Sequence, residues 1–171
     1  MKHNGKAVRS ITARMETTRH FVATVYVVHD GATVLHEHDR LGLWLPPGGH
    51  IDRDELPHEA ALREAHEETG LDVTLVQESA GVESPTSRPL PKPAHLLLED
   101  ITVHDGAVSH QHVDFIYFAE SSDRHVRPRG DDEASADSWE WVTAETLRND
   151  ERFDPDVIAH GIEAIETVAQ R

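Results

Sequence analysis

The sequence contains no cysteine, and this absence excludes several kinds of chemistry. A chain without thiols can form no disulfide, no thiolate metal site and no cysteine nucleophile. It also lacks an apolar run near the roughly 18 residues that a membrane-spanning helix needs, and no secretory signal peptide is visible. Its 171 residues suffice for one domain with its own core. We therefore expect a cytoplasmic protein with one main domain and no membrane segment.

Positive charge is scarce. Lysine and arginine together number 16 against 32 acidic residues, which gives a formal net charge of −16, and lysine occurs only at Lys2, Lys6 and Lys92. This charge argues against nucleic acid as a partner, because a polyanion is repelled unless cations intervene. The acidity fits either a halophilic habitat or an ordinary acidic cytosolic protein, and the sequence leaves both interpretations open.

The first 19 residues differ from the rest, with five cations against one acid. Such a segment is weakly similar to an organelle transit peptide. We favour the other interpretation, in which residues 1–19 form an N-terminal arm or a first element that packs on the acidic body. Residues 20–171 are then predicted to form a single domain.

Beyond this segment, strand and helix patterns are mixed. Runs rich in β-branched and aromatic residues predict strands at 20–28, 32–36, 44–45, 72–76, 94–103, 113–119 and 139–142, with a short one at 107–108. Helical spacing and stop signals predict a helix at 56–69, with Asp54 or Glu55 near its start and Gly70 as its stop. They also predict a helix at 155–169 and a small helix after Thr143. Residues 83–93 are rich in proline and predict a loop. The mixture indicates an α/β or α+β sandwich.

The helix predicted at 56–69 carries three carboxylates at positions i, i+3 and i+4, which are Glu64, Glu67 and Glu68. This spacing places them on one face of the helix, where like charges repel. Hard oxygen ligands gathered in this way suit Mg²⁺ or Mn²⁺, which would remove the repulsion. The alternative is a solvated acidic helix face, the usual fate of a run of charges.

The residues around these glutamates resemble the Nudix box, a glycine, five residues, a glutamate, seven residues and then R-E-U-x-E-E-x-G-U, where U is bulky and apolar. The segment from Gly49 to Leu71 matches every fixed position. The one soft departure is Ala65, which is small where a larger aliphatic residue is common. The resemblance implies a Nudix-type α/β/α sandwich with a mixed central β-sheet, spanning about residues 20–170.

The resemblance also implies a reaction, the Mg²⁺-dependent hydrolysis of a diphosphate bond in a nucleoside diphosphate derivative. The substrate would be ADP-ribose-like, a nucleotide sugar, a dinucleoside polyphosphate or a nucleoside triphosphate, and Mn²⁺ could replace Mg²⁺. A divalent ion is chemically reasonable, because an acidic enzyme must neutralise an anionic substrate before water can attack it. Many relatives are homodimers, so a homodimer is the assembly that the resemblance suggests.

The resemblance assigns roles residue by residue. Glu64, Glu67 and Glu68 would bind the metal together with the Gly49 carbonyl, and one of the glutamates could deprotonate the attacking water. Arg63 would orient these carboxylates. The remaining box residues would support the backbone and the loop–helix geometry: Glu55, Gly48, Gly49 and Gly70.

Other candidates lie outside the box. Glu133 is the best-placed residue for a further carboxylate from a late loop, although a solvated acidic loop is the favoured interpretation. Pro85 stands close to the position where relatives that cleave ADP-ribose carry a proline. Several aromatic residues could stack a base, but the sheet core is the more frequent place for each of them: Phe21, Tyr26, Phe115, Tyr117, Phe118, Trp44, Trp139 and Trp141.

Two pairs of histidines, His110 with His112 and His36 with His38, occupy alternate positions and could bind Zn²⁺. Without cysteine or an evident third ligand, we favour surface or substrate-facing roles for both pairs. His58 and His66 are interpreted as surface residues of the predicted central helix.

Two other functions compete with hydrolysis. A Nudix-like ligand sensor or interaction module would need no catalysis, yet it would also have no need of all three glutamates. An isopentenyl-diphosphate isomerase of the same fold would lean on a catalytic cysteine, which this chain lacks.

Overall fold

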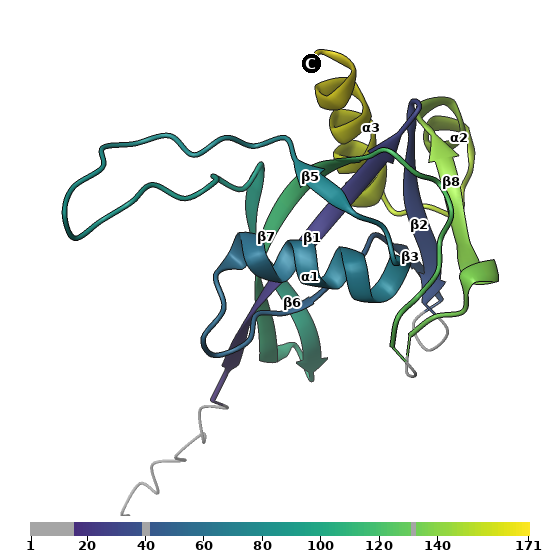
Figure 1. Cartoon of the computed structure of the whole chain (residues 1–171). Coiled ribbons are helices and arrows are strands. Elements are labelled where there is room, and N and C mark those ends of the chain that lie inside the picture. Colours follow the sequence, from purple (N-terminus) through teal and green to yellow (C-terminus); the bar gives the residue numbers. More distant parts are fainter. Residues whose placement is uncertain (1–15, 39–41, 131–132) are drawn as a thin grey trace, which may run out of the picture.

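The computed structural model describes residues 16–38, 42–130 and 133–171. Within these parts, eight strands form one sheet and three α-helices pack around it (Figure 1). The strands are β1 (Thr18–His29), β2 (Ala32–His38), β3 (Leu43–Leu45), β4 (Gly48–His50), β5 (Val73–Leu75), β6 (His95–His104), β7 (Ala107–Ser121) and β8 (Trp139–Thr143). The helices are α1 (Pro57–Thr69), α2 (Ala144–Asn149) and α3 (Pro155–Ala169), and a short 3₁₀ turn covers Ala136–Ser138.

The long strands β1 and β7 form the centre of the sheet. They pair in parallel, with Thr18 opposite His110 and Val28 opposite Glu120. The strand β1 also pairs antiparallel with β2 and β4, and β7 pairs antiparallel with β5 and β6. The sheet is therefore mixed, as the sequence predicts. The parallel pair needs a long crossover, which contains α1.

Two apolar cores lie on opposite faces of the sheet, because successive strand residues point to opposite sides. On one face, Ala23, Val25 and Val27 of β1 pack in a cluster with the buried alanines of α1. On the other face, Tyr26 and Val28 pack in a cluster with residues of α2 and α3. The helix α1 runs across the near face of the sheet in Figure 1. These layers confirm the predicted α/β/α sandwich.

The strands β1 and β7 are longer than the sequence predicts. The strand β7 is continuous over Ala107–Ser121, whereas the sequence suggested a short strand at 107–108 and another at 113–119. The strand β1 begins at Thr18, inside the segment interpreted as an arm. The parallel pairing extends both strands, since each supplies the other with backbone partners. Residues 1–15 lie outside the described residues, so the division at residue 19 stays a prediction.

No helix in the described parts of the chain is long and apolar enough to cross a membrane.

The C-terminal end of α1 is joined to the segment that follows β7. Gly70 ends the helix in the left-handed conformation, with φ of 69°, and its N–H donates to the His66 carbonyl. Beyond it, the Arg127 N–H donates to the Thr69 carbonyl at 2.7 Å, and the Arg129 N–H donates to the Glu67 carbonyl at 2.7 Å. These two bonds hold the segment before residue 130 against the last turn of α1.

This close approach predicts an unequal effect of two glycine substitutions. Gly31 and Gly70 both have positive φ, but a side chain at Gly31 meets nothing, whereas a Cβ at Gly70 would collide with the Arg127 carbonyl. We expect Gly31→Ala to lower the free energy of unfolding by about 1 kcal/mol, the cost of the left-handed conformation. Gly70→Ala should lower it by more than about 2 kcal/mol. Urea unfolding of both variants measures the difference, and equal losses would contradict the proposed packing.

Candidate active site

The helix α1 starts and ends at positions that its sequence specifies. Pro57 occupies the first turn, and the Glu59 carboxylate accepts a hydrogen bond from the Leu56 N–H at 3.0 Å. The cap therefore lies at Leu56, one or two residues after the acidic residues that the sequence suggested near the helix start. The buried side chains of α1 include Ala60, Ala61 and Ala65, which allow the helix to lie close to the sheet. The small residue at position 65 thus fits a helix packed tightly on strands.

Arg63 is the centre of the site. Its Nε and Nη2 donate to the two carboxylate oxygens of Glu55, each at 2.9 Å, in a bidentate pair. Its Nη1 donates to Glu64 Oε1 at 2.8 Å and to Glu67 Oε2 at 3.0 Å. The Nη2 also donates to the His50 carbonyl at 3.0 Å. One guanidinium thus fixes three carboxylates and the end of β4, which is the geometry expected for Arg63 and Glu55.

The short strand β4 brings two glycines against α1. The Gly48 N–H donates to Glu68 Oε1 at 3.0 Å. The backbone of Gly49 lies directly against the Glu64 carboxylate, and a Cβ at Gly49 would collide with it. A glycine is required there for a steric reason. The structure therefore brings together the box residues that the sequence singled out, except Gly70, which ends α1.

The electrostatics of the cluster are unfavourable without a cation. Glu68 is 8% exposed, and burial raises the pKa of its carboxyl to about 8, with further increases from Glu64, Glu133 and Glu67. Burial also raises the pKa of Glu64, although Arg63 opposes the increase. By contrast, hydrogen bonds from Arg63 lower the pKa of Glu55, which lies in the loop before α1 and outside this cluster.

Glu133 lies near this cluster, because its charge raises the pKa of both Glu64 and Glu68. It follows the segment that is held on α1 by the Arg127 and Arg129 backbone bonds. Sequence reasoning could suggest this carboxylate only by its place in the chain. The structure places its charge within electrostatic range of Glu64 and Glu68.

The donor set fits a hard divalent cation. Carboxylate oxygens and a backbone carbonyl are the ligands that Mg²⁺ accepts, and Glu64, Glu67 and Glu68 share one face with Gly49 beside them. A cation there would offset the mutual repulsion that raises the pKa of Glu68. The arrangement can therefore hold a metal ion and present it to an anionic ligand.

The other candidates are placed in several surroundings. His36 stacks on Trp139 with ring centroids 4.3 Å apart, and neither His36 nor His38 belongs to a three-residue metal-ligand group in the described parts of the chain. Pro85 lies in the loop between β5 and β6, which projects from the body in Figure 1. Tyr26, Tyr117, Phe118 and Trp139 are buried, whereas Phe21 is 58% exposed.

His66 is half-exposed beside Asp72, in agreement with a surface role. His58 is less open, because its Nδ1 is buried without a hydrogen-bond partner. His110 and His112 are joined by His20 and His50, which sequence reasoning missed. The signal for His20 is the parallel register of β1 and β7, which no local pattern reveals.

Comparison with known proteins decides the family. The family model described as the NUDIX domain matches residues 18–161. The chain belongs to the Nudix family. Comparison with curated protein sequences gives no significant match.

Solved structures agree with this family. A NUDIX-family hydrolase from Clostridium perfringens is 30% identical, with a TM-score of 0.76 over 88% of this chain and 99% of that one. The Ap4A hydrolase of C. elegans is 18% identical, with a TM-score of 0.51 over 90% of this chain and 98% of that one. A UDP-X diphosphatase is 17% identical, with a TM-score of 0.54 over 90% of this chain and 64% of that one. The last two share the fold alone. The chain is thus a Nudix pyrophosphohydrolase, as the resemblance of the box predicts.

A buried carboxyl lies on the opposite face of the sheet from α1. Asp114 of β7 is 4% exposed, accepts a hydrogen bond from the Thr24 hydroxyl at 2.8 Å through Oδ2, and has no partner for Oδ1 among the described residues. Burial raises the pKa of this carboxyl to about 7, and the charge of Glu99 adds to the increase. Ionised Asp114 is therefore a destabilising group.

This environment predicts a pH-dependent effect of Asp114→Asn. The native carboxyl keeps its proton up to about pH 7, whereas the unfolded one ionises near pH 4, so Asp114 lowers stability progressively as pH rises through that interval. The amide keeps an acceptor for Thr24 and does not ionise. We expect the melting temperature of the variant, relative to wild type, to increase by several degrees from about pH 4.5 to about pH 8. A difference that is constant with pH would contradict a raised pKa.

Proposed function

We propose that the protein hydrolyses a diphosphate bond in a nucleoside diphosphate derivative, with Mg²⁺ as its metal and Mn²⁺ able to replace it. The observation that carries the proposal is the carboxylate cluster of α1, held by Arg63 and pressed against the Gly49 backbone. A cluster of this kind is costly to bury and becomes favourable when it binds a cation.

The metal supplies charge neutralisation of the diphosphate and activation of a water molecule. The side chains of the box would hold this ion and take up the proton of the water. Glu64, Glu67 and Glu68 would hold the ion with the Gly49 carbonyl, and one of the three glutamates would accept the proton of the attacking water. Arg63 keeps Glu64 and Glu67 in fixed positions, which removes the need to order them during reaction.

The substrate class is an inference from the family and from the surface near the site. An exposed Phe21 lies 6.1 Å from Phe115 between ring centroids, and the Phe21 carbonyl accepts a hydrogen bond from Ile51, two residues after Gly49. An open aromatic ring on the same side of the sheet as the proposed metal-binding carboxylates suits a nucleoside base. A UDP-X diphosphatase and an Ap4A hydrolase share this fold, so compounds of both kinds belong among those to be tested.

The proposal predicts turnover of at least one such compound, and only with a divalent ion. We would measure products with ADP-ribose, nucleotide sugars, dinucleoside polyphosphates and nucleoside triphosphates, with millimolar Mg²⁺, with Mn²⁺, and with excess chelator. Cleavage should occur between two phosphates and stop with the chelator. Binding without turnover of any compound would instead favour a ligand sensor, and turnover in the chelator would contradict the metal.

The proposal also predicts the effect of neutralising single glutamates. Glu67→Gln and Glu68→Gln should each lower kcat by about 100-fold or more, since each removes a charge that holds the metal. The substitution Glu68→Gln keeps an acceptor for the Gly48 N–H, so the metal-free melting temperature of this variant should not fall.

Glu120→Gln is the matched control, because Glu120 is an exposed glutamate of β7 away from the cluster. This variant should keep wild-type kcat. Wild-type rates in both Glu67→Gln and Glu68→Gln would refute the assignment of the site.

A further inference from the structure

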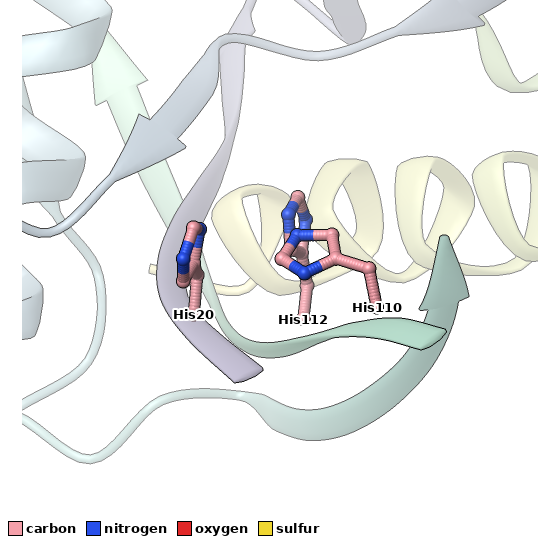
Figure 2. A group of neighbouring side chains, drawn as sticks. All are labelled: His20, His110 and His112. Atoms are coloured by element: carbon pink, nitrogen blue, oxygen red, sulfur yellow. The ribbon is translucent and has the colours of Figure 1, made fainter. Parts of the chain in front are cut away.

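Four histidines gather on the sheet face opposite α1. His20 belongs to β1, His50 to β4, and His110 and His112 to β7. Figure 2 shows the rings of His20, His110 and His112 projecting to the same side of their strands. One ring nitrogen of each of these three lies within 4.8 Å of the others. We call these three residues the histidine cluster.

The cluster is a product of strand register. His20 stands opposite His112 in the parallel pairing, and Thr18 stands opposite His110. Residues two apart on one strand share a face, so His110 and His112 both lie beside His20. Their ring centroids are 4.6 Å and 6.4 Å from that of His20. The pairing of the two strands thus fixes the backbone positions from which the three side chains project.

The cluster is separate from the carboxylate site, although β4 touches both. Gly49 faces Glu64 on the α1 side. The next residue, His50, has its Nε2 3.0 Å from His20 Nδ1, and its ring centroid lies 5.3 Å from that of His112. Successive residues of a strand point to opposite faces. The two sites therefore lie on opposite sides of the sheet.

The hydrogen bond of His110 leaves one of its ring nitrogens available. The Thr18 hydroxyl can donate to the Ser109 carbonyl at 3.3 Å while its oxygen accepts from His110 Nδ1 at 2.8 Å. That arrangement leaves the lone pair of His110 on Nε2. Orientation of a histidine by a bond from its other nitrogen is typical of metal ligands.

The cluster also has no anionic partner among the described residues. No carboxylate in the described parts of the chain forms an ion pair with His20, His110 or His112. A second group, formed by His95, His160 and Glu163, differs in this respect, because His95 and Glu163 already form an ion pair at 2.8 Å. The histidine cluster is therefore the better candidate for a cation.

We propose that His20, His110 and His112 bind a late first-row divalent ion such as Zn²⁺, with Thr18 and His50 as positioning residues. Neutral imidazole nitrogens suit Zn²⁺ and its neighbours in the series, whereas Mg²⁺ requires oxygen ligands. The ion would join the start of β1 to β7. This site is distinct from the box and does not depend on the proposed hydrolysis.

The test uses full-length protein freed of transition metals, in millimolar Mg²⁺ that is added to compete for the carboxylate site. Co²⁺ is the spectroscopic probe, because it replaces Zn²⁺ and absorbs visibly when four or five nitrogen and oxygen ligands surround it. We expect one equivalent of Co²⁺ to give this absorption and one equivalent of Zn²⁺ to abolish it. A wild-type protein without the absorption would overturn the proposal.

Variants then locate the ion. His110→Ala and His112→Ala should each weaken Zn²⁺ binding by about 10-fold or more in competition with a chromophoric chelator, and Thr18→Val should weaken it about 10-fold. His104→Ala is the matched control, because His104 is an exposed histidine of β6 outside the cluster. Its affinity should equal that of wild type.

Each remaining outcome has a meaning. Unchanged affinity in His110→Ala and His112→Ala, or an equal loss in His104→Ala, would overturn the proposal. A loss in Glu67→Gln alone would assign the Zn²⁺ to the carboxylate site and would also overturn it. If either alanine variant melts below wild type without metal, Thr18→Val decides, since it leaves all three imidazoles in place.

Discussion

The bonds of Arg63 are the interaction on which the rest of the site depends. A single guanidinium holds Glu55 by two bonds, contacts Glu64 and Glu67, and reaches the His50 carbonyl. Without it, Glu55, Glu64 and Glu67 would lose the cation that all three contact. Through these bonds, Arg63 joins α1 to Glu55 in the loop before it and to the end of β4. The planar fork of arginine suits this role, and lysine could not make the same set of bonds.

The sheet supplies the second constraint. The parallel pairing of β1 with β7 sets which residues share a face, and it separates two chemically different regions. Hard oxygen ligands lie on the α1 side, and imidazoles lie on the other. Because β4 is paired with β1, two of its residues, Gly49 and His50, face these two regions in turn. The backbone of the sheet separates the two regions.

Much of the fold and of the box could be predicted because the relevant signals are local. Glu64, Glu67 and Glu68 were expected on one face because of the helical period. The end of the helix at Gly70 was expected because glycine tolerates positive φ. The mixture of predicted strands and helices indicated the sandwich. The length of β7 could not be predicted in this way, because its middle is polar and is extended by pairing with β1.

What the sequence could not reveal depends on contacts between distant segments. The histidine pair at 110 and 112 was visible, but its neighbour His20 required the register of two strands. Glu133 was visible as a late acid, but its place beside Glu68 depends on the backbone bonds that hold the preceding segment on α1. No periodicity encodes either contact. Helical and strand periods describe one element at a time.

Those backbone bonds have a mechanical consequence. The amides of Arg127 and Arg129 are hydrogen-bonded to carbonyls of Thr69 and Glu67, so they occupy acceptors that the final turn of a helix normally leaves to water. The late segment therefore serves as the C-terminal cap of a helix formed much earlier in the chain. Any displacement of this segment would unwind that turn, and it would loosen the Glu67 backbone and carry Glu133 away in the same movement.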